Sequence, residues 1–175
     1  GNFTYEIGAS SVLENTVYDT ASITKTIPVA LTALKLIAQG RLSLEDKIIK
    51  YVPEITIPNA EKGLVKHLLT STYVLKKNPN EGFSYEHAKA KDIFDFLFTR
   101  EFEFLPGTHY QYANTALNLL GIILERVSGE KLYMLTEKII LDPLEMKNST
   151  FHPNDTNLIP PTEIISWRGV IQGEV

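Results

Sequence analysis

Apolar residues recur at the three- and four-residue spacing of a helix in three stretches of the chain, residues 23–38, 117–127 and 132–140. A glycine or proline follows each stretch, which is typical of the end of a helix. The first stretch is apolar on nearly every side, so we expect a buried central helix. Pro28 lies inside it and should kink or shift its first two turns, because proline has no backbone N–H to donate.

Shorter helices are predicted between the long ones. Residues 65–69 and 92–99 show helical spacing, the latter with Ile93, Phe94 and Leu97 expected to face inward. The chain between these elements contains several prolines and glycines, which favour turns.

The remaining segments are more varied. Alternating apolar and polar residues over 3–7 predict a strand, and residues 164–175 are expected to return to extended structure. Residues 76–87 are rich in Lys, Asn, Pro and Gly and predict an exposed loop. Ser43 is followed three residues later by Asp46, a variant of the capping box that predicts the start of a short helix.

Composition narrows the function classes. The 175 residues suggest one domain or part of a larger one, and a hydrophobic content of 43% is enough for a core. A net charge of −4 without a basic run argues against nucleic acid as a partner. No apolar run approaches the ~20 residues of a membrane span. The absence of cysteine excludes disulfides and thiolate chemistry, and the four histidines lack metal-ligand spacing, so we expect no metal.

The candidate chemistry lies at the start of the first helix, in Ser22-Ile23-Thr24-Lys25. A helix brings residues i and i+3 onto one face, so the amino group of Lys25 can reach the Ser22 hydroxyl. Backbone N–H groups at a helix start have no intrahelical partner, and the helix dipole there favours negative charge. A hydroxyl, an amine and free N–H donors are the parts needed for acyl transfer.

This four-residue pattern is short, and two observations keep other interpretations open. A serine at a helix start is more often a simple N-cap. The chain also holds a second Ser-x-x-Lys sequence, at residues 128–131, which falls across the predicted end of a helix. We interpret this second sequence as a helix-end turn rather than a catalytic site.

Further short motifs follow Ser22 in a fixed order. They are Gly40-Arg41-Leu42-Ser43-Leu44-Glu45-Asp46, His67-Leu68-Leu69-Thr70, Pro106-Gly107, Tyr112-Ala113-Asn114, Asn118-Leu119-Leu120-Gly121 and Pro143-Leu144-Glu145-Met146. In this order and spacing, the chain resembles the superfamily of serine β-lactamases and penicillin-binding proteins. It is most similar to the class C branch and its esterase and D-peptidase relatives. The resemblance runs from about residue 1 to residue 150, and more weakly to the end of the chain.

The resemblance implies an α/β (α+β) fold of the β-lactamase/transpeptidase type and a role for four residues. Ser22 would be the nucleophile that forms an acyl-enzyme, and Lys25 would help to remove its proton. Tyr112 would act as general acid and base, with its pKa lowered by a nearby positive charge. Asn114 would position Lys25 and the substrate amide. Without Ser22 and Lys25, the last two would be interpreted as an aromatic residue at a helix start and an N-cap.

The resemblance further implies a serine hydrolase without cofactor, acting on a small-molecule or peptide substrate. The candidate substrates are β-lactams, D-amino-acid peptides and small esters. A periplasmic or cell-envelope location is typical of the family, and the oligomeric state is left open. The alternative is a non-catalytic β-lactamase-like module for binding or an accessory role in a larger protein.

The chain departs from the family in length. The family places a third motif, Lys-Thr-Gly or His-x-Gly, on a late strand that supplies the second oxyanion donor, and neither sequence occurs here. We therefore expect a partial domain: residues 1–17 a sheet strand and loop, 18–150 mainly the helical subdomain, and 151–175 a loop returning towards the sheet. Such a fragment is expected to be inactive alone, because a missing oxyanion donor can cost ~3 kcal/mol in the barrier.

A second departure follows Thr70, where the family usually continues His-Thr-Ser-Gly. This chain continues Ser71-Thr72-Tyr73-Val74, so valine stands in place of the glycine. Valine adopts a left-handed conformation poorly, and we expect this loop to take a different path.

Overall fold

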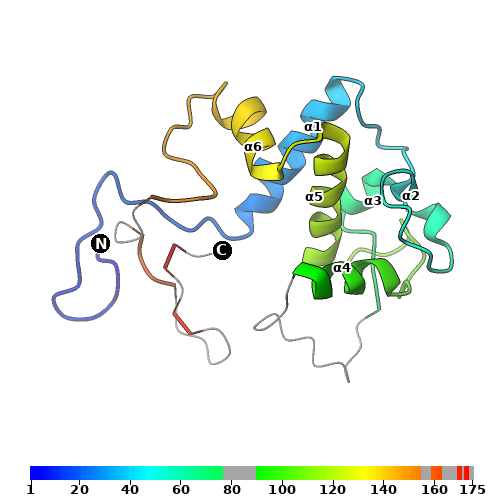
Figure 1. The fold of residues 1–175 in the computed structure, drawn as a ribbon. Coiled ribbons are helices and arrows are strands. Elements are labelled where there is room, and N and C mark those ends of the chain that lie inside the picture. The colour runs from blue at the N-terminus through cyan, green and yellow to red at the C-terminus, as the bar shows by residue number, and fades with distance from the viewer. Residues whose placement is uncertain (77–89, 155–158, 163–168, 171, 174–175) are drawn as a thin grey trace.

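The computed structural model describes residues 1–76, 90–154, 159–162, 169–170 and 172–173. Figure 1 shows α5 at the centre, with α1 and α6 on one side and α2 and α3 on the other. The helical elements within the described residues are η1 (Lys25–Ala30), α1 (Leu31–Ala38), α2 (Ile48–Tyr51), η2 (Ala60–Lys62), α3 (Val65–Leu69), α4 (Ala90–Thr99), α5 (Asn114–Ser128), α6 (Leu132–Thr136) and η3 (Glu137–Leu141).

The first predicted helix forms, with its early turns widened. Helical structure begins at residue 23, continues as the π-helix η1 and then becomes the regular helix α1. Pro28 lies within η1. Because proline cannot donate the regular i to i−4 hydrogen bond, a wider turn at this point accommodates it. The predicted shift of the first two turns is confirmed.

The prediction that this helix is buried on all sides is wrong for the described residues. Val29, Ala33 and Leu36 are buried against α5, α6 and η3, and they share one helix face. The opposite face carries exposed apolar side chains. These are Ile23, Ile27, Leu31 and Leu34, which are 36–53% exposed. Apolar residues therefore surround the whole helix, but only one of its faces is buried by packing.

Helix α5 provides the centre of the core. Leu119, Leu120, Ile123 and Leu124 have no exposed surface, and the helix contacts α1, α2, α3 and α6. It ends at Gly129, whose φ of +77° is the left-handed conformation common after a helix. The predicted helix over 117–127 is confirmed; it begins three residues earlier and ends one residue later than predicted.

The second Ser-x-x-Lys sequence lies at this end of α5. The Ser128 hydroxyl accepts a hydrogen bond from the Glu130 N–H at 3.1 Å and donates to the Glu125 carbonyl at 3.3 Å. Its interpretation as a helix-end turn is confirmed. The following helix, predicted over 132–140, forms as α6 and η3 in succession.

The predicted strand over residues 3–7 is wrong. The chain bends back there, so that the Phe3 N–H donates to the Ser10 carbonyl at 2.8 Å. Tyr5 and Ile7 are fully exposed. A strand requires a neighbour that receives its hydrogen bonds, and among the described residues this segment has one isolated bridge, between Asn2 and Ser11.

Helix α4 confirms the predicted helix over 92–99 but not all of its inward residues. Leu97 is buried, and Ile93 is partly buried and packs against the core. Phe94 is 42% exposed, so its predicted inward position is wrong. Its ring instead stacks on Phe98, one turn further along, with centroids 5.9 Å apart.

Two short predictions have different outcomes. Helix α3 forms over the predicted residues 65–69. The Ser43 N–H donates to Asp46 Oδ2 at 2.9 Å as in a capping box, but residues 43–46 form a turn and α2 starts at Ile48. Lys47 is held extended between them by a bridge to Leu64. The predictions for 76–87 and 164–175 fall largely outside the described residues.

Candidate active site

A left-handed residue places Ser22 at the start of the first helix. The Ala21 N–H donates to Asp19 Oδ1 at 2.7 Å, and Ala21 has a φ of +42°. This conformation costs an L-residue about 1 kcal/mol. The Ser22 carbonyl then accepts the Lys25 N–H at 3.1 Å and begins the helical hydrogen bonding. The role of Asp19 was missed from the sequence, although aspartate two residues before a turn commonly forms such a hydrogen bond.

Three of the four predicted site residues meet at one oxygen atom. Lys25 Nζ donates to Ser22 Oγ at 2.8 Å, as the i to i+3 spacing predicts. The Tyr112 hydroxyl, 90 residues further along the chain, donates to the same Oγ at 2.8 Å. The Lys25 ammonium also lies 5.2 Å from the centroid of the Tyr112 ring, within the range of a cation–π contact.

The environment of these groups is polar and open. Ser22 is exposed, Lys25 is partly buried and Tyr112 is 57% exposed. The hydrogen bond with Ser22, followed by the hydrogen bond and positive charge of Lys25, lowers the pKa of Tyr112 below its ordinary value. The direction agrees with the sequence prediction, but the Ser22 hydroxyl contributes more than the positive charge. The phenol therefore loses its proton more readily than an isolated tyrosine does.

Asn114, the fourth predicted residue, opens α5 two positions after Tyr112. Its side chain is exposed, and within the described part of the chain it has no hydrogen-bond partner. The predicted role of Asn114 in holding Lys25 therefore stays a prediction.

The segment that carries Tyr112 is held by the turn that follows α3. The Gln111 N–H donates to the Ser71 carbonyl at 3.0 Å, and the Gly107 N–H donates to the Thr72 carbonyl at 3.0 Å. Ser71 is the left-handed residue of this turn, with a φ of +53°. Val74 is buried and does not adopt that conformation, as expected from its β-branched side chain. Ser71 belongs to no recognised turn pattern, so its left-handed conformation was not predicted.

No group of three or more His, Asp or Glu side chains close enough to hold a metal ion occurs among the described residues. In the same part of the chain, every helix is too short or too polar to cross a lipid bilayer.

Sequence comparison identifies the family. The sequence model described as Beta-lactamase matches residues 5–166. Esterase EstB of Burkholderia gladioli is 31% identical over 156 residues, which cover 79% of this chain and 39% of the esterase. A putative D-alanyl-D-alanine carboxypeptidase of Escherichia coli (strain K12) is 28% identical over 150 residues, which cover 79% of this chain and 34% of that protein.

Solved structures share the fold. A class C β-lactamase in complex with cefoxitin superposes with a TM-score of 0.75 at 24% identity, covering 93% of this chain and 45% of the other. EstCE1, a hydrolase with promiscuous acyltransferase activity, gives a TM-score of 0.77 at 21% identity and covers 94% and 47%. The fold is therefore of the β-lactamase/transpeptidase type, here mostly helical, and the chain spans less than half the length of these proteins. The chain belongs to the Beta-lactamase family.

Proposed function

We propose that the protein is a serine hydrolase that forms an acyl-enzyme on Ser22 with an amide or ester substrate. The observation that carries this proposal is the convergence of Lys25 Nζ and the Tyr112 hydroxyl on Ser22 Oγ, each at 2.8 Å. A nucleophile and a base within hydrogen-bond reach of each other, with a third group beside them, form the arrangement required for covalent catalysis.

The proposed reaction uses the three groups in sequence. The lowered pKa of Tyr112 favours its deprotonated form, which is proposed to accept the proton of Ser22 as Oγ attacks the substrate carbonyl carbon. The Lys25 ammonium stabilises the phenolate and the developing negative charge. Tyr112 then donates its proton to the leaving amine or alcohol, and the acyl-enzyme forms. In the second half-reaction a water molecule transfers a proton to Tyr112 and attacks the ester carbonyl carbon. Tyr112 then returns that proton to Ser22 Oγ as the bond between Oγ and the acyl carbon breaks, which releases the acid and free Ser22.

Asn114 is proposed to orient the substrate amide beside this group, because it follows Tyr112 by two residues at the start of α5. For the substrate we propose the classes that the relatives' names suggest: small esters, D-amino-acid peptides and β-lactams. The chemistry shared by all three is an acyl group bonded to a leaving oxygen or nitrogen.

Intact-mass spectrometry of the full-length protein tests the proposal, after exposure to a fluorophosphonate and, separately, to a penicillin. One fluorophosphonate adduct is expected on the wild type and none on Ser22→Ala. The matched control is Ser128→Ala, which removes the serine of the other Ser-x-x-Lys sequence and should leave the adduct unchanged. An adduct that persists in Ser22→Ala would contradict the proposal. Absence of any adduct and any hydrolysis in the wild type would favour the non-catalytic module instead.

A further inference from the structure

Two motifs with no role in the proposed reaction meet in the structure. His67 lies in α3, and Gly107 lies in the turn before Tyr112. Gly107 has a φ of +86°, and a Cβ atom added there would lie 2.8 Å from His67 Nε2 and 3.3 Å from Cδ2. The backbone of the turn therefore rests directly against the edge of the imidazole ring, at a distance that only glycine allows.

The imidazole is fixed in orientation by the start of its own helix. His67 Nδ1 accepts the Leu64 N–H at 3.2 Å, which caps α3. Nδ1 therefore carries no proton, and in the neutral ring the proton is on Nε2, the nitrogen that faces Gly107. Burial, and next the positive charge of Lys66, lower the pKa of His67, whereas Glu45 acts in the opposite direction. The ring is thus a neutral, oriented support at neutral pH.

Hydrogen bonds continue from His67 to the residue before Tyr112. The His67 carbonyl accepts the Thr72 N–H at 2.9 Å, and the Thr72 carbonyl accepts the Gly107 N–H at 3.0 Å. The neighbouring Ser71 carbonyl accepts the Gln111 N–H at 3.0 Å. The segment 107–111 is therefore attached at both ends to the turn that follows α3, and Tyr112 comes immediately after the second attachment.

We propose that His67 is a positioning residue for Tyr112, acting through the contact of its ring with Gly107. By supporting the segment 107–111, the ring sets the 2.8 Å separation between the Tyr112 hydroxyl and Ser22 Oγ. This inference rests on the proposed function for its effect on acylation. Its effect on the ionisation of Tyr112 does not require the protein to be an enzyme.

The test is a double-mutant cycle of Gly107→Ala and His67→Asn in the full-length protein. Asparagine is shorter than histidine, yet its side-chain oxygen can accept the Leu64 N–H and preserve the cap of α3. Gly107→Ala brings both a clash with the ring and the strain of a positive φ. The strain is present in both backgrounds and cancels in the cycle, so the coupling reports the ring contact.

The first readout is the ionisation of Tyr112, measured as ultraviolet difference absorbance against Tyr112→Phe in each background. Gly107→Ala and His67→Asn should each raise the Tyr112 pKa towards the ordinary value of about 10, because the hydrogen bond to Ser22 is lost or lengthened. The second readout is the rate of Ser22 acylation by a fluorophosphonate, which should fall by about tenfold to a hundredfold. In the His67→Asn background, Gly107→Ala should slow acylation by less than about a further threefold.

Gly129→Ala is the matched control. Gly129 has a similar φ of +77°, but nothing lies within 4 Å of an added Cβ, so the substitution brings the strain without a clash. It should lower stability and leave both readouts unchanged. An unchanged Tyr112 ionisation in Gly107→Ala and His67→Asn would overturn the inference. If the ionisation shifts as expected but the wild type is never acylated, the positioning role stands and the proposed function fails.

Discussion

The hydroxyl of Tyr73 offers a sharp test of the energetics of this core. Its side chain is 2% exposed, and its ring packs edge-on against Phe102 with centroids 4.9 Å apart. Within the described residues, the hydroxyl has no hydrogen-bond partner, and burial raises its pKa. An unsatisfied buried polar group costs about 1–3 kcal/mol, whereas the phenyl ring of Tyr73→Phe keeps the packing. We therefore expect Tyr73→Phe to stabilise the protein by about 1 kcal/mol.

Tyr51 provides the matched control, because the same change should have the opposite sign there. Its hydroxyl donates to Asp46 Oδ2 at 2.6 Å. A hydrogen bond to a charged group contributes about 1.5–3 kcal/mol, and partial exposure places this one at the lower end. Tyr51→Phe should therefore destabilise the protein by about 1.5 kcal/mol at neutral pH.

Urea unfolding of the wild type and both variants, followed by circular dichroism at pH 7, measures the two changes. For a chain of this size, 1 kcal/mol corresponds to about 2–4 °C in melting temperature, which gives an independent check. The two variants should differ in stability by about 2.5 kcal/mol, the sum of the two expected effects. A Tyr73→Phe variant that is less stable than the wild type would refute the reasoning, because the lost hydroxyl must then have had a partner.

Two further predictions concern polar contacts between segments that are far apart in the sequence. The hydroxyls of Thr32 and Thr136 lie 3.1 Å apart without exposed surface, so Thr32→Val and Thr136→Val should each cost about 1–2 kcal/mol by stranding the other hydroxyl. In urea unfolding, a double variant that costs the full sum would contradict this coupling. Arg126 lowers the pKa of Glu54 to about 2, so the stability from this carboxylate is present above its ordinary value of 4.5 and is lost as pH falls towards 2. Because both side chains are over one-third exposed, Glu54→Gln should remove about 0.5–1 kcal/mol at pH 7 and flatten the acid slope, and an unchanged slope would contradict the assignment.

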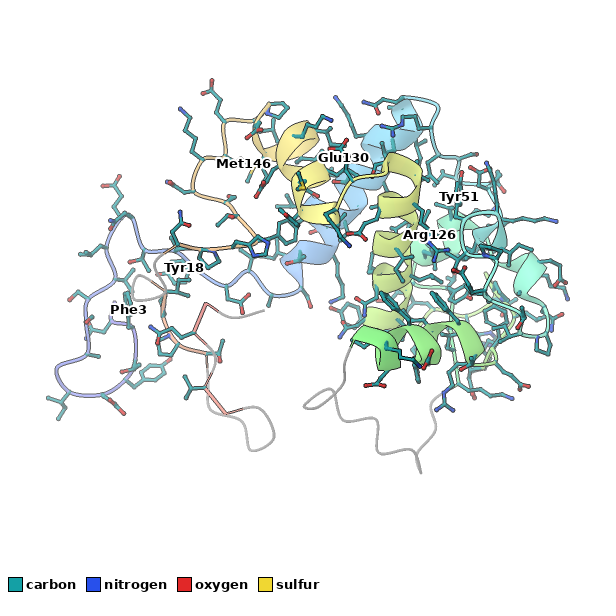
Figure 2. The ribbon with its side chains drawn as sticks, viewed as in Figure 1. Phe3, Tyr18, Tyr51, Arg126, Glu130 and Met146 are labelled. Atoms are coloured by element: carbon teal, nitrogen blue, oxygen red, sulfur yellow. The ribbon has the colours of Figure 1, made fainter. Side chains whose placement is uncertain are left out.

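The contact of Arg126 with the end of α2 and with Glu54 in the turn that follows was not predictable from spacing. Arg126 also donates to the Tyr51 carbonyl at 2.8 Å, and Figure 2 shows these two residues side by side. They are 75 residues apart in the sequence, and nothing local links them. The helices themselves were predictable, because the spacing of apolar residues and a terminator such as Gly129 act within a few residues.

In the site, too, local contacts could be predicted from the sequence, and contacts between distant segments could not. The contact of Ser22 with Lys25 follows from the geometry of one helical turn, and the sequence predicted it without any relative. The contact with Tyr112 required the resemblance to a family, because it depends on how two distant segments pack. The turn at Ser71 and the support by His67 were predicted by neither, since backbone hydrogen bonds between loops leave little trace in residue type.

The exposed apolar face of the first helix shows why burial was predicted incorrectly. Ile27, Leu31 and Leu34 are as hydrophobic as the buried face, so the sequence cannot distinguish a covered side from an uncovered one. The strand predicted over residues 3–7 failed for a related reason, because an alternating pattern specifies which side chains share a face but does not provide the neighbouring strand. In both cases the pattern predicts an apolar face that needs another element to pack against it. Among the described residues, α5 and α6 are such elements for one face of the first helix. Ser22 lies at the start of this helix, which is packed on one face and exposed on the other. That position suits the nucleophile of the proposed reaction, because Lys25 and Tyr112 hold the hydroxyl while its exposure would admit a substrate.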